Sequence, residues 1–170
     1  MIRIPDDIYQ HIIADTEQSY PNEACGLLGG YKDDKDNFHV TSYRTSPNIA
    51  GGTRQDRFEI DPGVRFKFMR DLGIISNPRT ADHGAETIIG HYHSHPDHPA
   101  KPSATDLEMA YEPEFVWIIV SVMAGKAASI TAHKLIQQPS NAELYEFKEI
   151  QLLSPDGTPY AALKPIQPET

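Results

Sequence analysis

Apolar and polar positions along the chain recur with two different periods, which predict helices and strands in one domain. Isoleucines spaced for one face of a helix follow Pro5, so we expect an amphipathic helix that ends near Pro21. Apolar residues recur with the same period over residues 64–72, after an Asp-Pro pair that is typical of a helix start. The pattern therefore predicts two helices before the middle of the chain.

Strand signals separate and follow these helices. Residues 37–43 are rich in β-branched and aromatic residues, and residues 115–123 form an apolar run typical of a buried strand. Strands are also predicted at residues 24–31, 57–60, 86–95, 126–136 and 144–153. Ala124 and Gly125 are placed to form a hairpin turn between two of these runs. The polar residues 76–85 are expected to form a loop. With no internal repeat, the chain is expected to adopt an α/β fold.

Length and composition are consistent with one domain. A chain of 170 residues buries roughly 70% of its unfolded surface when it folds. We expect this domain to span residues 1–153. The remaining residues 154–170 contain four prolines and are expected to form a loose tail.

Charge and cysteine content narrow the classes of function. The 15 Lys and Arg residues against 24 Asp and Glu residues give a formal charge of −9, and no basic run could follow a phosphate backbone, so nucleic acid is not an expected partner. No apolar run approaches the roughly 20 residues of a membrane span. Cys25 is the only cysteine, which excludes an intrachain disulfide, and we interpret it as a small core residue. Without a recognisable signal peptide, the expected location is the cytoplasm.

Three histidines occupy alternate positions of one predicted strand. His91, His93 and His95 therefore project from the same face, so two of them can reach one metal ion, although alternation alone does not say which two. Asp106 follows at short range and could supply a carboxylate. Two imidazoles, one carboxylate and an open fourth position are typical of a catalytic zinc site.

The segment that follows the histidines has a second possible explanation. Ser103 and Asp106 fit the capping box of a short helix, which needs a hydroxyl at the N-cap and an acid three residues later. Capping and metal binding are compatible, because an acid in a first helical turn can also point outward. The prolines within residues 97–102 are expected to pin the intervening loop.

These residues resemble the signature of the JAMM (MPN+) metalloproteases, in which His-[Ser/Thr]-His-Pro is followed after six residues by Ser and then, two residues later, by Asp. The match places His93, His95, Ser103 and Asp106 at the signature positions. The segment beginning at Glu23 also resembles the strand that starts with the family's glutamate. The resemblance covers about residues 23–122. It implies an α/β sandwich of the cytidine-deaminase-like kind, in which helices flank a curved mixed sheet.

The resemblance also implies a role for each residue. The pair directly before the proline, His93 and His95, would bind Zn²⁺ together with Asp106, and the ion would lower the pKa of a bound water toward about 7. Glu23 would act as the base that carries a proton to the leaving amine. Ser103 would stabilise the developing oxyanion. His91 is then expected to be a packed neighbour.

The family further implies a class of substrate. The chain resembles the small prokaryotic members that cleave after the C-terminal Gly-Gly of ubiquitin-like sulfur carrier proteins of the ThiS or MoaD kind, by peptidase or isopeptidase chemistry. Such cleavage would release cysteine, another adduct or a short peptide. Residues 45–60 are a candidate wall of the groove for the diglycine tail, with Asn48 as a candidate substrate contact, although a turn also explains Asn48. The loop of residues 76–85 is a second candidate contact.

Other functions remain compatible with the residues alone. A metal-binding or scaffold module of the same fold would bind without hydrolysis. A thiol hydrolase would use Cys25 and would ignore chelators. Deamidation or cleavage of a small amide would use the same metal chemistry on another substrate.

Overall fold

The computed structural model describes residues 1–50, 57–74, 85–138, 141–161 and 163. Within these residues the helices are α1 (Asp6–Ser19), α2 (Pro62–Asp71) and α3 (Ala104–Glu108). The strands are β1 (Ile2–Arg3), β2 (Cys25–Lys32), β3 (Phe38–Ser46), β4 (Thr87–Pro96), β5 (Val116–Met123), β6 (Lys126–Gln138), β7 (Asn141–Ile150) and β8 (Leu152–Leu153).

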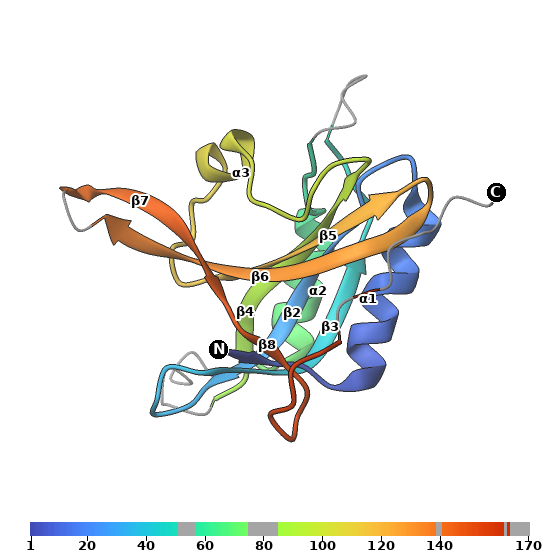
Figure 1. Cartoon of the computed structure of the whole chain (residues 1–170). Helices are drawn as coiled ribbons and strands as arrows, with labels where there is room; N and C mark the ends of the chain where they lie inside the picture. Colours follow the sequence, from blue (N-terminus) through green and yellow to red (C-terminus); the bar gives the residue numbers. More distant parts are fainter. Residues whose placement is uncertain (51–56, 75–84, 139–140, 162, 164–170) are drawn as a thin grey trace.

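The described strands form one curved, mixed sheet of eight strands in the order β7-β6-β5-β4-β2-β3-β1-β8 (Figure 1). The histidine-bearing strand β4 lies near its middle, where it pairs antiparallel with β2 and parallel with β5. The sheet and its flanking helices confirm the expected α/β class. The helix α1 crosses one face, and the β6–β7 hairpin projects away from the body (Figure 1).

Each face of the sheet is covered by its own apolar cluster, because side chains alternate along each strand. Ile8 and Ile12 of α1 pack against residues such as Tyr92 and Val120 in the larger cluster. On the other face, Phe68 of α2 packs in a smaller cluster with residues of β2 and β4. The histidines of β4 have the opposite parity to Tyr92 and therefore lie on the α2 face.

The close approach of β4 to its neighbour depends on a missing side chain. A Cβ atom built on Gly90 would lie 2.1 Å from the backbone oxygen of Val116, a distance that the parallel pairing of β4 with β5 cannot accommodate. Glycine at position 90 therefore allows β5 to pair along the whole histidine-bearing stretch, from Gly90 to Pro96.

Most predicted elements are present within a few residues of their expected bounds, including the hairpin turn at Ala124 and Gly125. The strand predicted at residues 57–60 is wrong, because only Ile60 forms an isolated bridge, with Asn48. The predicted loop at residues 76–85 lies outside the described residues except for Ala85.

The prediction of a loose C-terminal tail is wrong for the first half of that tail. The ring of Tyr160 stacks on that of Tyr9, with centroids 3.9 Å apart. The Tyr160 hydroxyl lies 2.8 Å from the backbone oxygen of Ile4 and 2.6 Å from Oδ1 of Asp6. An aromatic residue near the C-terminus thus completes the packing of α1. The domain boundary after residue 153 stays a prediction.

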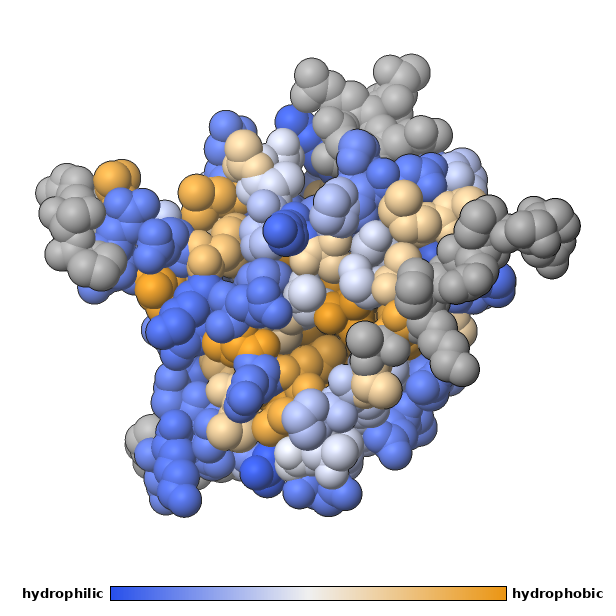
Figure 2. Space-filling model, in the orientation of Figure 1, coloured by the Kyte–Doolittle hydropathy of each residue, from blue (hydrophilic) through white to orange (hydrophobic). Residues whose placement is uncertain are grey.

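The surface in view combines a polar perimeter with an apolar centre. Figure 2 shows apolar side chains gathered over the middle of this face and polar side chains around them. Among the described residues, no helix is both long and apolar enough to span a bilayer.

Candidate metal centre and active site

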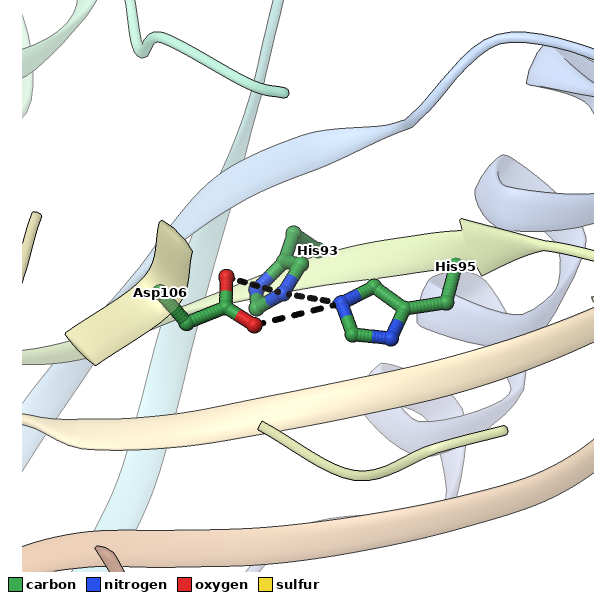
Figure 3. Close-up of side chains that lie close together, drawn as sticks. All are labelled: His93, His95 and Asp106. Carbon is green, nitrogen blue, oxygen red and sulfur yellow. Dashed lines mark hydrogen bonds and ion pairs between the residues drawn. The ribbon is translucent and has the colours of Figure 1, made fainter. Parts of the chain in front are cut away.

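His93, His95 and Asp106 point toward one another from two elements, strand β4 and helix α3 (Figure 3). Nε2 of His93 lies 3.0 Å from Nε2 of His95 and 3.3 Å from Oδ1 of Asp106. Nε2 of His95 lies 3.4 Å from Oδ2 of Asp106. All three side chains are buried. The structure therefore brings together the three residues that were predicted from the sequence to be metal ligands.

The distances among these atoms fit a tetrahedral cation. Nitrogen and oxygen donors about 2.0–2.2 Å from one zinc ion would lie about 3.3–3.5 Å apart at the tetrahedral angle. The separations of 3.0–3.4 Å are close to this expectation. The cluster can hold a metal ion after small adjustments of side chains that already converge.

A backbone contact selects the tautomer of His95. Its Nδ1 lies 2.9 Å from the backbone oxygen of Pro99, which can only accept a hydrogen bond. Nδ1 must therefore carry the proton, and in the neutral ring Nε2 presents its lone pair to the cluster. A ligand histidine whose second nitrogen donates to a carbonyl is a recurring arrangement at metal sites.

Asp106 is oriented by the helix cap that its sequence predicted. The Asp106 amide donates to Oγ of Ser103, at 3.0 Å, while Oδ2 of Asp106 accepts from the Ser103 amide and hydroxyl at 2.6 and 2.7 Å. Burial alone would raise the pKa of Asp106, but the adjacent rings of His93 and His95 and the hydrogen bonds from Ser103 hold it well below its usual range. The carboxylate is therefore charged at neutral pH, as a metal ligand must be.

Burial acts in the same direction on both histidines, but Asp106 affects them unequally. Burial lowers the pKa of His93, and the neighbouring carboxylate only partly opposes it. For His95, burial also lowers the pKa, but hydrogen bonds to Asp106 and Pro99 outweigh it and the pKa is raised. Asp106 is thus the main negative charge facing both rings.

His91 shares the face of the other two histidines but lies outside the ligand group. Its ring packs edge-on against Trp117, with centroids 4.1 Å apart, and the side chain is buried. Burial lowers the pKa of His91 well below its usual value. The described group that could hold a metal ion contains His93 and His95 without His91, which agrees with the predicted pair.

Glu23 lies beside the cluster, two residues before the start of β2. It is only 6% exposed and lines a cavity of about 330 Å³ together with His95 and Ser103. The neighbouring residue Ala24 is held to β4, because its amide donates to Oγ of Ser94 at 2.8 Å. The strand that carries the histidines therefore also fixes the backbone beside Glu23.

Ser94 is a contributor that sequence reasoning missed. Its side chain is fully buried on the face opposite the two histidines. The available signal was its parity between His93 and His95, since a hydroxyl pointing away from the metal needs a partner of its own. Its partner is the amide next to Glu23.

Asn48 binds backbone groups with its whole amide. Its Nδ2 donates to the backbone oxygens of Glu23 and Arg57, at 3.2 and 3.1 Å. Its Oδ1 accepts from the amides of Ala50 and Glu59, both at 3.0 Å. The amide therefore fastens two stretches of residues 45–60 to the backbone of Glu23, and these four contacts occupy the groups that a direct substrate contact would require.

Phe58, which belongs to residues 45–60, packs against the proposed ligand His93. Its ring stacks on that of His93 with centroids 4.4 Å apart and an interplanar angle of 17°. Sequence reasoning assigned Phe58 to a strand and missed this contact. The aromatic ring shields His93 from solvent and limits its rotation.

Cys25 is a core residue, as the sequence indicated. The Cys25 side chain is fully buried, and burial, with smaller contributions from Asp15 and Glu23, raises the pKa of its thiol to about 12. A thiol that remains protonated is a poor nucleophile, which argues against the thiol-hydrolase alternative. His98 is exposed and lines the cavity beside Glu23.

Comparison with known families agrees with this site. Residues 5–135 match the family described as prokaryotic homologs of the JAB domain, and the chain belongs to that family. It is accordingly a hydrolase with JAMM-type peptidase or isopeptidase chemistry. The resemblance inferred from the His-Ser-His-Pro signature is confirmed.

Two relatives share the larger part of the chain. A desampylase of Haloferax volcanii is 31% identical over 116 residues, which cover 68% of this chain and 74% of the relative. A CysO-cysteine peptidase of Mycobacterium tuberculosis is 26% identical over 133 residues, which cover 76% of this chain and 80% of the relative.

Two solved structures share the fold. A Desulfitobacterium hafniense protein has a TM-score of 0.65 and 26% identity, covering 91% of this chain and 92% of its own. A Salinibacter ruber protein has a TM-score of 0.58 and 31% identity, covering 98% of this chain and 99% of its own.

Proposed function

We propose that this chain is a zinc-dependent peptidase that cleaves after the C-terminal Gly-Gly of a ubiquitin-like sulfur carrier protein and releases cysteine, another adduct or a short peptide. The observation that carries the proposal is the convergence of His93, His95 and Asp106, whose donor atoms lie 3.0–3.4 Å apart. In this proposal these three side chains hold the zinc ion. A bound ion would polarise the scissile carbonyl and make water more acidic.

Glu23 is the group we assign to proton transfer. It lines the cavity beside His95 and is not a member of the ligand cluster. In the reaction, water forms a bond to the carbonyl carbon, Glu23 accepts the proton that water loses, and the same proton passes to the nitrogen as the carbon–nitrogen bond breaks. A buried carboxylate beside the site can make both transfers without rearrangement of the fold.

Ser103 combines two tasks in this proposal. Its hydroxyl belongs to the cap that orients Asp106, at 2.7 Å from Oδ2. Ser103 also lines the cavity that Glu23 and His95 share, so its hydroxyl could turn toward the oxygen of a bound peptide group. A donor fixed beside a developing oxyanion stabilises the transition state more than the substrate.

The substrate class rests on the relatives and on the strand edge beside the site. The relatives are named as a desampylase and a CysO-cysteine peptidase, and they share about a quarter to a third of their aligned residues with this chain. Within the described residues, Phe38 and His39 are the only residues of β3 that pair with β1, which leaves the rest of that edge of β3 available. The available part of β3 ends at Ser46, which pairs with Cys25 of β2. A diglycine tail lacks side chains and could add to such an edge.

The test uses the zinc-loaded protein and a sulfur carrier protein extended beyond its Gly-Gly. The mixture is incubated with and without a zinc chelator, and the products are weighed by intact mass spectrometry. We expect cleavage directly after the diglycine, loss of cleavage with chelator, and recovery when zinc is restored. Bound zinc without cleavage would reject this substrate class.

A further inference from the structure

The cavity beside Glu23 is enclosed on one side by the loop of residues 97–102. The cavity measures about 330 Å³ and its lining includes His98, Pro99, Lys101 and Thr105. This volume lies at the lower end of the range of about 300–1,000 Å³ that is usual for small-molecule sites. It suits a single amino acid better than a folded partner.

This loop is fastened to the sheet at successive backbone groups. The backbone oxygen of His98 accepts from Oγ of Ser121 at 2.7 Å, and that of Ala100 accepts from Oγ1 of Thr131 at 2.6 Å. Between them, the backbone oxygen of Pro99 accepts from His95. Because consecutive carbonyls are anchored, the loop presents its side chains from a defined position.

Lys101 is the lysine that this loop brings to the cavity. It is exposed, lines the cavity, and also lines a neighbouring groove formed with α3 and β7. Across the described part of the chain, its ammonium takes part in none of the ion pairs within 4.0 Å. The ammonium is therefore available to a ligand.

Its position matters because the surroundings are acidic. The chain carries a net charge of −9, and carboxylates of Glu23 and Asp106 lie at the site. An anionic leaving group would be repelled by these charges unless a cation stood nearby. Lys101 supplies such a cation in the lining of the cavity that also contains the acid that we assign to proton transfer.

The geometry of an amino acid connects the two side chains. In an adduct joined through its α-amine, the carboxylate carbon lies only about 2.5 Å from the nitrogen that leaves. The amine must depart beside Glu23, so a free α-carboxylate enters the same cavity. In a longer extension, or in an isopeptide bond to lysine, a neutral amide or a methylene chain takes that place.

Resting on the function proposed above, we infer that Lys101 binds the free α-carboxylate of a single amino acid joined to the carrier's terminal glycine. The enzyme should therefore prefer a one-residue adduct over a peptide extension or a lysine isopeptide. Lys101 acts as a specificity-determining residue and takes no part in the proton transfer.

The test compares two carriers that differ only in terminal charge. One ends in Gly-Gly-Cys with a free carboxylate, and the other carries the same residues with a C-terminal carboxamide. For the zinc-loaded wild type, we expect a kcat/KM about ten- to a hundredfold higher for the carboxylate, the range for a hydrogen bond to a charged group. The difference should arise mainly in KM and should shrink at 1 M salt.

Variants assign this preference to one side chain. Lys101→Gln should cleave both carriers at the rate of the carboxamide form, and Lys101→Arg should restore part of the preference. Lys35→Gln is the matched control, because it removes the same charge from an exposed turn that follows β2, at the end of the strand away from Glu23. Equal cleavage of both carriers by the wild type, or an undiminished preference in Lys101→Gln, would overturn the role of Lys101 and leave the proposed function standing. If the wild type cleaves neither carrier, the proposed function fails and this inference fails with it.

Discussion

Replacing Ser103 with alanine separates the cap of α3 from the chemistry of the site. The substitution removes the hydrogen bond from Oγ to Oδ2 of Asp106 and the bond from the Asp106 amide to Oγ. The bond from the Ser103 amide to Oδ2, at 2.6 Å, does not depend on the side chain and should persist. Asp106 would therefore remain near the histidines with a looser orientation.

The expected cost follows from these contacts. Loss of a serine N-cap costs about 1 kcal/mol. The second lost hydrogen bond has a charged acceptor, but Ser103 is exposed, so water can take the place of its hydroxyl. The total loss in the free energy of unfolding should therefore be about 1–2 kcal/mol. For a domain of this size, that loss lowers Tm by about 2–8 °C. Because Ser103 orients a proposed ligand, zinc affinity should also fall, by about ten- to a hundredfold.

Thermal unfolding with zinc and with chelator measures the two effects separately. Ser103→Thr serves as control, since its hydroxyl can keep both bonds and should keep Tm near that of the wild type. Activity measured at saturating zinc then reports any additional role of the hydroxyl at the oxyanion. An unchanged Tm and an unchanged zinc affinity in Ser103→Ala would refute the argument that this cap positions Asp106.

Three further predictions address the base, the ligands and the thiol. Glu23→Gln should retain zinc and Tm while kcat falls by about 10²–10⁴-fold, and full activity would exclude Glu23 as the base. Asp106→Ala should lose zinc by elemental analysis, whereas one tightly bound zinc per chain would exclude Asp106 as a ligand. Cys25, whose pKa is raised to about 12 from 9.0, should resist alkylation in the native protein at pH 8.5. The thiol of the unfolded chain ionises at a lower pH than the buried thiol, so the free energy of unfolding should fall as pH rises from about 9 toward 12. The fall should be smaller in Cys25→Ala. An equal fall in both proteins would contradict the assigned burial.

The sequence predicted correctly those helices and strands in which the spacing of apolar residues matches the side of the element that is buried. Ile8 and Ile12 mark the buried side of α1, and the apolar run of β5 is buried on both faces of the sheet. Residues 57–60 carry a similar alternation but do not form a strand. Their backbone is instead held by the amide of Asn48, a long-range contact that no local pattern reveals.

The candidate site was predictable where spacing alone determines geometry. Alternation placed three histidines on one face, and the capping pattern placed Asp106 in a first helical turn. The choice of His93 and His95 over His91 depended on a family signature, because only the packing of α3 near one end of β4 distinguishes them. The stacking of Phe58 on His93 and the reach of Tyr160 to Tyr9 arise from chain segments far apart in sequence, so periodicity could not disclose them.

The three proposed ligands differ in how firmly the fold holds them. His93 pairs with Cys25 of β2 and with Ile119 of β5, and His95 pairs with Ser121 of β5, so the backbone of this stretch is released only when the sheet itself comes apart. Asp106 belongs to a helix of five residues. Leu107 in this helix and Met109 directly after it are both about 40% exposed. Such a helix opens locally at a small fraction of the cost of global unfolding. The opening of α3 would consequently govern the residence time of a bound ion, and the histidine pair would stay in place to receive the next ion.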